Sequence, residues 1–299
     1  MSKLTSTLKH FSSQLPNFAA YSLQEPSLFW QCLKYAKKSY RSVNEINGKA
    51  QADQLKSRGV VQAQIAEEDV PLAKKMGKRF SNLIKSEKYY QPSDPNRANT
   101  KAFGKYIFSF KGDWRLYFPE IFYIVEHNLG GLLRSYFGKD YFIMSAEIRR
   151  TRYLPPDSPI KDAYSNFWHF DWRRNDHAWL LMTLHLNDHV HKESFHTFEL
   201  DVSHEALRNK LHGRYPAQGL PEALKNKKYL TTGGPVGTCY LANVADLLHR
   251  AGDPGPEKDR DVIFVFLGSH VPWFNDIGFK NQTPYQIESD QSAHYSFAK

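Results

Sequence analysis

The chain has 299 residues, of which 41% are hydrophobic, 14% aromatic and 24% charged. This composition is typical of globular proteins and excludes the disordered and fibrous classes. The formal net charge of +9 favours anionic partners, such as a phosphorylated or carboxylated small molecule, a nucleic acid or an acidic membrane surface. Net charge alone does not choose among them.

Three features of the sequence bear on its compartment. No run approaches 18 consecutive apolar residues, so we expect no transmembrane helix. The first residues lack the unbroken apolar run of a signal peptide. The two cysteines, Cys32 and Cys239, have no paired spacing, which suggests a reducing environment. We therefore predict a cytoplasmic protein, with peripheral contact to an acidic membrane left open.

The first part of the chain carries mainly helix signals. Apolar residues recur at three- and four-residue spacing in 26–42, while the polar stretch 48–57 is typical of a loop or a short helix. Residues 60–65 read as a strand, and 67–86 as a helix that opens with acids and closes with bases. Another helix is predicted from Pro119 to Gly138. We expect residues 1–140 to form a mostly helical layer.

The pattern changes at Tyr141, where short runs rich in β-branched and aromatic residues begin to alternate with turn residues. The predicted strands lie in 141–154, 167–172, 178–186, 195–200, 237–243 and 261–271. Short strands after a block of helices indicate an α+β protein with a sandwich or barrel core. We predict one catalytic domain over residues 1–299, with a β core in 141–275 and a C-terminal tail in 276–299.

A candidate metal site begins with His169 and Asp171, two residues apart in the predicted strand 166–172. Because side chains alternate along a strand, both are expected on the same side. His249 ends a short apolar run before a glycine-rich loop and is the predicted third ligand. Two histidines and one carboxylate are the ligand set expected for iron(II) with open coordination positions.

Arg260 follows His249 by eleven residues and directly precedes the apolar run DVIFVFL. A guanidinium that points into an otherwise apolar barrel needs an anionic partner, and its planar fork suits a carboxylate. Arg260 is therefore a candidate anion-binding residue beside the predicted metal.

The strings WHFDW, LHLND and LLHRAG, with Arg260 leading DVIFVFL, resemble the iron(II)/2-oxoglutarate dioxygenases, and most of all the phytanoyl-CoA dioxygenase family. The stretch GVVQAQIAEEDVPLAKKM is also similar, so the resemblance covers roughly 59–270. It implies a double-stranded β-helix (a cupin-like jelly roll), Fe(II) on His169, Asp171 and His249, and 2-oxoglutarate with its far carboxylate on Arg260. Dioxygen would be consumed, and succinate and CO2 released, as the substrate is hydroxylated. Asp171 fills the position that related halogenases leave for a halide, which favours hydroxylation.

Other residues are candidates for contacts near this site. Asn166 and Thr183 are predicted to donate hydrogen bonds to 2-oxoglutarate, and Arg149 and Arg152 to receive an anionic group of the substrate. Trp172 is a further candidate for substrate contact. A second histidine cluster is interpreted as solvated loop residues, because it lacks the cysteines of a zinc site; its members are His185, His189, His191 and His196.

The sequence thus favours a hydroxylase of a small or lipid-linked substrate, either neutral or anionic. Three alternatives stay open. The first is a cupin-type metal-binding isomerase, and the second is a non-catalytic binding protein. The third is a nucleic-acid demethylase of the same fold, in which a second arginine is expected six residues after the first. That position is Phe266 here, so a nucleic-acid partner is not favoured.

Overall fold

The computed structural model describes residues 45–85, 107–110, 114–138, 141–153, 166–171, 179–188, 195–211, 213–216, 219–252 and 259–268. Helices in these ranges are α3 (Glu45–Arg58), η1 (Glu67–Asp69), α4 (Val70–Lys85), α6 (Trp114–Tyr117), α7 (Glu120–Phe137), α8 (Leu200–Arg208) and α9 (Glu222–Lys225). The strands are β1 (Val60–Gln64), β2 (Ile107–Ser109), β3 (Phe142–Thr151), β4 (Trp179–His185), β5 (Phe195–Thr197), β6 (Leu230–Thr232), β7 (Thr238–Ala242), β8 (His249–Ala251) and β9 (Arg260–Gly268).

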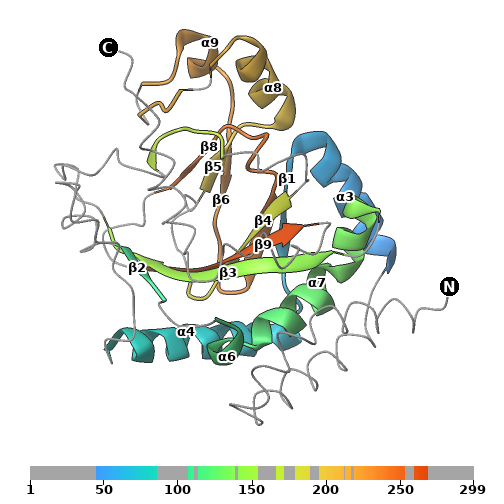
Figure 1. Cartoon of the computed structure of the whole chain (residues 1–299), viewed down its shortest axis with the longest axis vertical. Coiled ribbons are helices and arrows are strands. Elements are labelled where there is room, and N and C mark those ends of the chain that lie inside the picture. The colour runs from blue at the N-terminus through green and yellow to red at the C-terminus, as the bar shows by residue number, and fades with distance from the viewer. Residues whose placement is uncertain are drawn as a thin grey trace, which may run out of the picture.

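These strands form two sheets. The large sheet has the order β1-β7-β4-β9-β3-β2, and the small sheet has the order β6-β5-β8. Every pairing is antiparallel, and partners are distant in sequence: β9 lies between β3, where Arg260 faces Thr151, and β4, where Val262 faces His185. Helices α4, α6 and α7 lie on one side of the large sheet, and the small sheet lies on the other (Figure 1).

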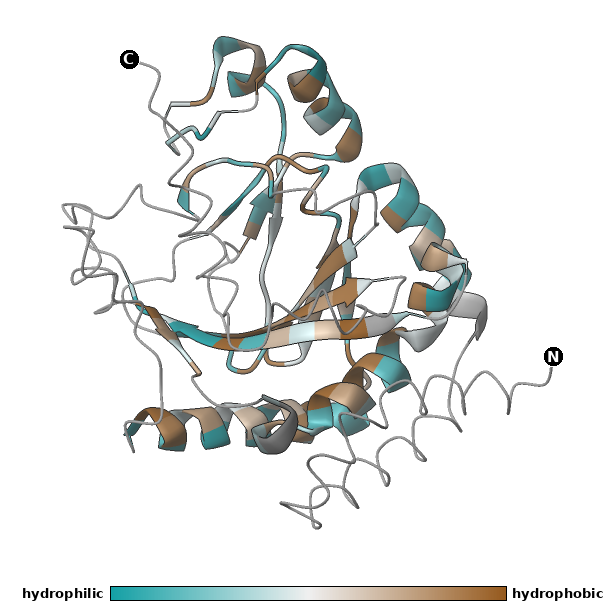
Figure 2. Ribbon diagram, viewed as in Figure 1, coloured by the Kyte–Doolittle hydropathy of each residue, from teal (hydrophilic) through white to brown (hydrophobic). Residues whose placement is uncertain are grey.

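Alternation along β4 gives the large sheet two different faces. Leu180, Met182 and Leu184 belong to the main apolar core, together with residues of α4 and α7, and this is called the outer face below. Leu181 belongs to a second cluster with Phe195 of the small sheet and Tyr240 of β7, and this is called the inner face. Brown, hydrophobic segments follow the strands, while brown and teal alternate along α4 (Figure 2). The inner face is therefore the side on which the two sheets meet.

Two glycines decide how the helices are placed. Gly138 has φ of 68° and ends α7 in the left-handed conformation, which glycine adopts without steric cost. On α3, a Cβ at Gly48 would lie 2.7 Å from backbone atoms of Gly131 and Leu132 on α7. Helices α3 and α7 therefore pack with their backbones in close approach.

Several predicted elements are confirmed: 60–65 contains β1, 67–86 contains η1 and α4, and the helix between Pro119 and Gly138 is α7, with Pro119 as its N-cap. The polar stretch 48–57 lies within the 14-residue helix α3, which buries Ala52 and Leu55. The predicted helix 26–42 and the tail 276–299 lie outside the described residues.

One strand prediction is wrong. The segment 167–172 contains no regular strand in its described part, but only isolated bridges at Trp168, to Tyr215, and at His169, to His249. The run 195–200 is also shorter than predicted, because β5 ends at Thr197 and α8 begins at Leu200. Aromatic residues gave 167–172 a strand-like composition, but each bridge there pairs with a different partner segment.

Within the described ranges, no helix combines the length and the apolar character that crossing a bilayer would require. Cys239 is buried and forms no disulfide, while Cys32 lies outside the described residues. The cytoplasmic location stays a prediction.

Candidate metal centre

The backbone brings the three predicted ligands together. His169 and His249 form an isolated antiparallel bridge, in which each N–H donates to the other residue's carbonyl at 2.8 and 2.9 Å. The N–H of Asp171 donates to the carbonyl of Val244 at 3.1 Å, which fixes the segment at a second point. The side chains of His169, Asp171 and His249 therefore converge although their segments are nearly 80 residues apart in sequence.

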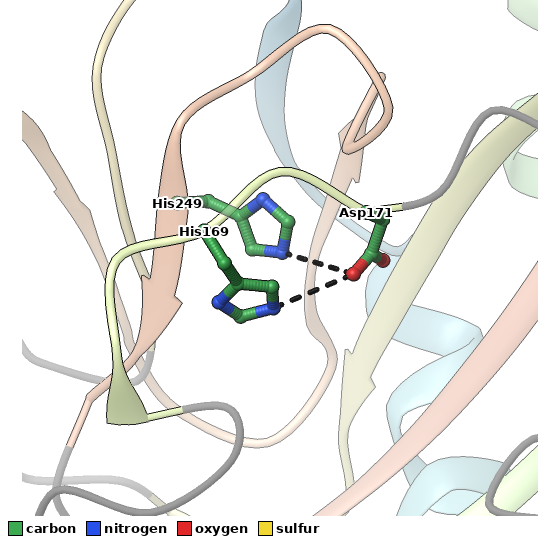
Figure 3. A group of neighbouring side chains, drawn as sticks. All are labelled: His169, Asp171 and His249. Carbon is green, nitrogen blue, oxygen red and sulfur yellow. Dashed lines mark ion pairs between the residues drawn. The ribbon is translucent and has the colours of Figure 1, made fainter. Parts of the chain in front are cut away.

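The converging atoms are the two imidazole Nε2 atoms and one carboxylate oxygen (Figure 3). Oδ1 of Asp171 lies 3.4 Å from Nε2 of His169 and 3.8 Å from Nε2 of His249. The ligand atoms of the three residues all lie within 4.8 Å of one another, close enough to share one metal ion. The carboxylate is 25% exposed while both imidazoles are buried, so one side of the group is open.

Hydrogen bonds fix the tautomer of both histidines. Nδ1 of His169 lies 2.6 Å from the carbonyl oxygen of Phe167, and Nδ1 of His249 lies 2.9 Å from that of Leu247. A carbonyl oxygen only accepts, so each Nδ1 carries the proton and each Nε2 keeps its lone pair. This is the arrangement by which a second hydrogen bond orients a metal-binding histidine.

The local electrostatics favour cation binding. Burial, together with the nearby His169, lowers the pKa of His249 to about 4, although Asp171 opposes the shift. Burial alone would raise the pKa of Asp171, but the adjacent imidazoles of His169 and His249 and the charge of Arg214 outweigh it and lower that pKa. A neutral His249 and an ionised Asp171 are the protonation states that bind a metal ion.

Arg260 begins β9 and is buried. Alternation places it on the inner face with Val262 and Phe264, because Ile263 and Val265 belong to the outer core. Its Nη1 donates to the carbonyl of Gly252 at 2.6 Å, one residue beyond β8. The arginine thus links the large sheet to the strand that begins with His249.

Thr183 lies on the inner face of β4, opposite Tyr240 and Phe264. It is 1% exposed, and its Oγ1 finds no hydrogen-bond partner among the described residues. A buried hydroxyl without a partner is costly and is a usual sign of a bound group or water. Asn166 is also buried, and its backbone carbonyl accepts a hydrogen bond from Nη1 of Arg250 at 3.4 Å.

The two candidate substrate arginines lie on opposite faces of the large sheet. Arg149, on the inner face, donates from Nε and Nη2 to the Glu147 carboxylate at 3.0 and 2.9 Å, and lies 4.9 Å from the Phe264 ring centroid. Arg152 follows β3, is 47% exposed, and lies 4.6 Å from the ring centroid of Phe108. Trp172 lies outside the described residues.

The interpretation of the second histidine cluster is wrong for its two described members. His185 is 0% exposed on the inner face, and His196 is 2% exposed on β5 against Trp168 and Tyr229. His189 and His191 lie outside the described residues. His185 ends the apolar run of β4, two residues after Thr183, so alternation along that run was the signal that could have placed it inward.

No family model matches the chain, and no curated protein matches its sequence. Among solved structures it is similar to the non-haem α-ketoglutarate-dependent epimerase SnoN from nogalamycin biosynthesis, with 12% identity over 74% of this chain and 82% of that chain, and a TM-score of 0.50. Other matches are AviO1 from Streptomyces viridochromogenes Tue57 (13% identity, 74% and 94% coverage, TM-score 0.48) and a prolyl hydroxylase from Trichoplax adhaerens (12%, 80% and 91%, 0.47). The similarity to SnoN shows a shared fold: a mixed arrangement of helices and antiparallel sheets.

Proposed function

We propose that the protein is a non-haem iron(II)/2-oxoglutarate-dependent dioxygenase that hydroxylates a small or lipid-linked substrate. The observation that carries this proposal is the convergence of Nε2 of His169, Nε2 of His249 and Oδ1 of Asp171, with both Nδ1 atoms bound to carbonyls. Two imidazoles and one carboxylate suit iron(II) and leave further coordination positions open. The fold shared with SnoN, described as an α-ketoglutarate-dependent enzyme, is compatible with it.

The finer fold prediction belongs to the same proposal. The two antiparallel sheets meet through the inner-face cluster of Leu181, Phe195 and Tyr240, as expected for a double-stranded β-helix. We infer that this core and its helices form one catalytic domain over 1–299. Membership of the phytanoyl-CoA dioxygenase family rests on the sequence resemblance alone.

The residues near the triad fit the co-substrate. The far carboxylate of 2-oxoglutarate would pair with Arg260, which lies on the inner face and contacts Gly252 close to His249. The hydroxyl of Thr183 would donate to the same molecule, which would satisfy its buried Oγ1. When bound, iron(II) with 2-oxoglutarate and dioxygen supplies the oxidising power for C–H hydroxylation, with release of succinate and CO2.

The chain's own groups would protect and shape this chemistry. The centroid of the Phe195 ring lies 5.4 Å from that of His249 and 4.8 Å from that of Tyr240. This ring therefore limits the access of water to His249 on that side. Asp171 fills the position that a halide would need, which favours hydroxylation. Arg149 is tied to Glu147 on the inner face and is the proposed contact for a polar or anionic substrate group.

The alternatives can be separated from this proposal. A nucleic-acid substrate is not proposed, because the position of a demethylase's second arginine is Phe266. This side chain packs against Trp179, with 5.7 Å between the ring centroids. A cupin-type isomerase or a non-catalytic binding protein would bind a metal at the same triad without responding to 2-oxoglutarate.

Anaerobic addition of iron(II) and 2-oxoglutarate tests the proposal. We expect a weak visible charge-transfer band, its loss in His169→Ala, and its retention in the control His204→Ala, which alters a histidine of α8 outside the triad. Arg260→Leu should raise the 2-oxoglutarate concentration needed by tenfold or more, because a charge-assisted hydrogen bond is lost. Absence of the band in the wild-type protein would refute the proposal, and metal binding without a 2-oxoglutarate response would favour the cupin-type alternative.

A further inference from the structure

His185 is a buried polar side chain that the proposed reaction does not yet use. It is the last residue of β4 and is 0% exposed. It lies on the inner face, two residues after Thr183, and its ring centroid lies 6.4 Å from that of Tyr240. Its backbone carbonyl accepts from the N–H of Gly237 at 3.0 Å, so the neighbouring strands hold this end of β4 in place.

The sheet register brings His185 close to Arg260. His185 faces Val262 across the β4–β9 pair, and Arg260 is the next residue of β9 on the same face. A residue and the diagonal neighbour two positions along the partner strand are within reach of long side chains. Thr183, His185 and Arg260 therefore follow one another on the inner face, away from the Trp179 end of β4.

The imidazole of His185 is held neutral. Burial and, as a smaller cause, the charge of Arg260 lower its pKa to about 4, while a hydrogen bond to the backbone of Gly234 opposes the shift. That the Arg260 charge acts on it is consistent with the proximity given by the register. A neutral ring at this position adds no second positive charge beside the guanidinium, but occupies volume and offers polar atoms.

We propose that His185 forms the end of the 2-oxoglutarate site beside Arg260 and sets the length of the 2-oxo dicarboxylic acid that the protein accepts. This inference rests on the proposed function. A five-carbon acid would reach Arg260 with its far carboxylate and meet the imidazole directly behind it. An acid with one more methylene would need the volume that the imidazole fills.

The test compares binding of 2-oxoglutarate and 2-oxoadipate to His185→Ala, with cobalt(II) in place of iron and isothermal titration as the readout. Removing the ring should lower the preference for 2-oxoglutarate over 2-oxoadipate about tenfold, the discrimination that a packed pocket gives for one methylene. His196→Ala is the matched control: it removes an equally buried histidine that Thr231 and Tyr229 contact on the other side of β5, and should leave that preference unchanged.

A merely structural role for His185 would lower the melting temperature in both alanine variants and leave the ratio of the two dissociation constants unchanged, and that result would overturn the inference. If His185→Ala does not fold, His185→Ser is the second variant: it keeps a polar group but removes the ring volume, and should also lower the preference. A preference equal to that of the wild type would contradict the proposal. Failure of the proposed function would be distinguishable, because the wild-type protein would then bind neither acid in the presence of metal.

Discussion

Replacing Thr183 by valine should make the ligand-free protein at least as stable as the wild type and should weaken 2-oxoglutarate binding. Threonine and valine are both β-branched and similar in shape, so β4 is not disturbed. The change removes one hydroxyl that is buried and has no hydrogen-bond partner among the described residues. Stability would thus be kept or increased while the affinity for 2-oxoglutarate falls, and a purely structural role for Thr183 would not produce this combination.

The magnitudes follow from the burial of that hydroxyl. A buried polar group without a partner costs about 1–3 kcal/mol, so the free energy of unfolding of the Thr183→Val variant should be unchanged or higher by up to that amount. A hydrogen bond to a charged carboxylate contributes about 1.5–3 kcal/mol. Its loss should raise the 2-oxoglutarate dissociation constant about ten- to hundredfold.

Urea denaturation of the metal-free protein and titration of the iron(II) protein with 2-oxoglutarate would measure the two quantities. Thr232→Val is the control, because its Oγ1 is buried but donates to the carbonyl of Phe195 at 3.4 Å. That variant should lose about 1 kcal/mol of stability and keep its 2-oxoglutarate affinity. The reasoning would be refuted if Thr183→Val lost stability and bound 2-oxoglutarate as tightly as the wild type.

Two further predictions concern stability. His185 and His196 both have their pKa lowered by burial to about 4 from 6.5. In this pH range the unfolded chain takes up protons that the folded protein does not. The free energy of unfolding should therefore fall as pH drops from about 6.5 to about 4, by up to about 3 kcal/mol per histidine. Denaturation at pH 7, 5.5 and 4.5 measures this, and the free energy of unfolding should depend less steeply on pH in His196→Leu. Gly48→Ala should cost about 1–3 kcal/mol in a thermal melt, because its Cβ would meet the backbone of Gly131 at 2.7 Å; an unchanged melting temperature would contradict this packing.

The convergence of His169, Asp171 and His249 could be predicted from their identities and order, although a shared strand is not the structural reason for it. The sequence interpretation placed His169 and Asp171 on one strand, whereas the structure holds His169 by a bridge to His249 and Asp171 by a bond to the backbone of Val244. Both arrangements place His169 and Asp171, which are two residues apart, on the same side. The pairing of His169 with His249 depends on contacts between distant segments, which local spacing cannot reveal.

The buried histidines were missed for a related reason. The close spacing of His185, His189, His191 and His196 in a polar stretch predicts a solvated loop. The burial of His185 depends instead on β7 and β9, which flank β4 and come more than 50 residues later in the chain. The burial of His196 depends on Trp168 and Tyr229, whose ring centroids lie 6.3 and 5.3 Å from that of the imidazole. Neither partner can be inferred from the residues beside the histidine.

Alternation along β9 also explains why Arg260 and Asp261, adjacent in sequence, do not neutralise each other. Asp261 lies on the outer face, where both of its carboxylate oxygens accept from Arg150 at 2.6 Å. Burial raises the pKa of Asp261, and the hydrogen bond and charge of Arg150 oppose that rise. Arg150 is in turn bound to Ser81 of α4 at 2.7 Å, so this pair joins the sheet to a helix. Asp259, the other sequence neighbour of Arg260, lies 3.7 Å from Arg150 and 3.8 Å from Arg152. Because both neighbouring carboxylates pair with other arginines, neither competes with an anionic ligand for the guanidinium of Arg260.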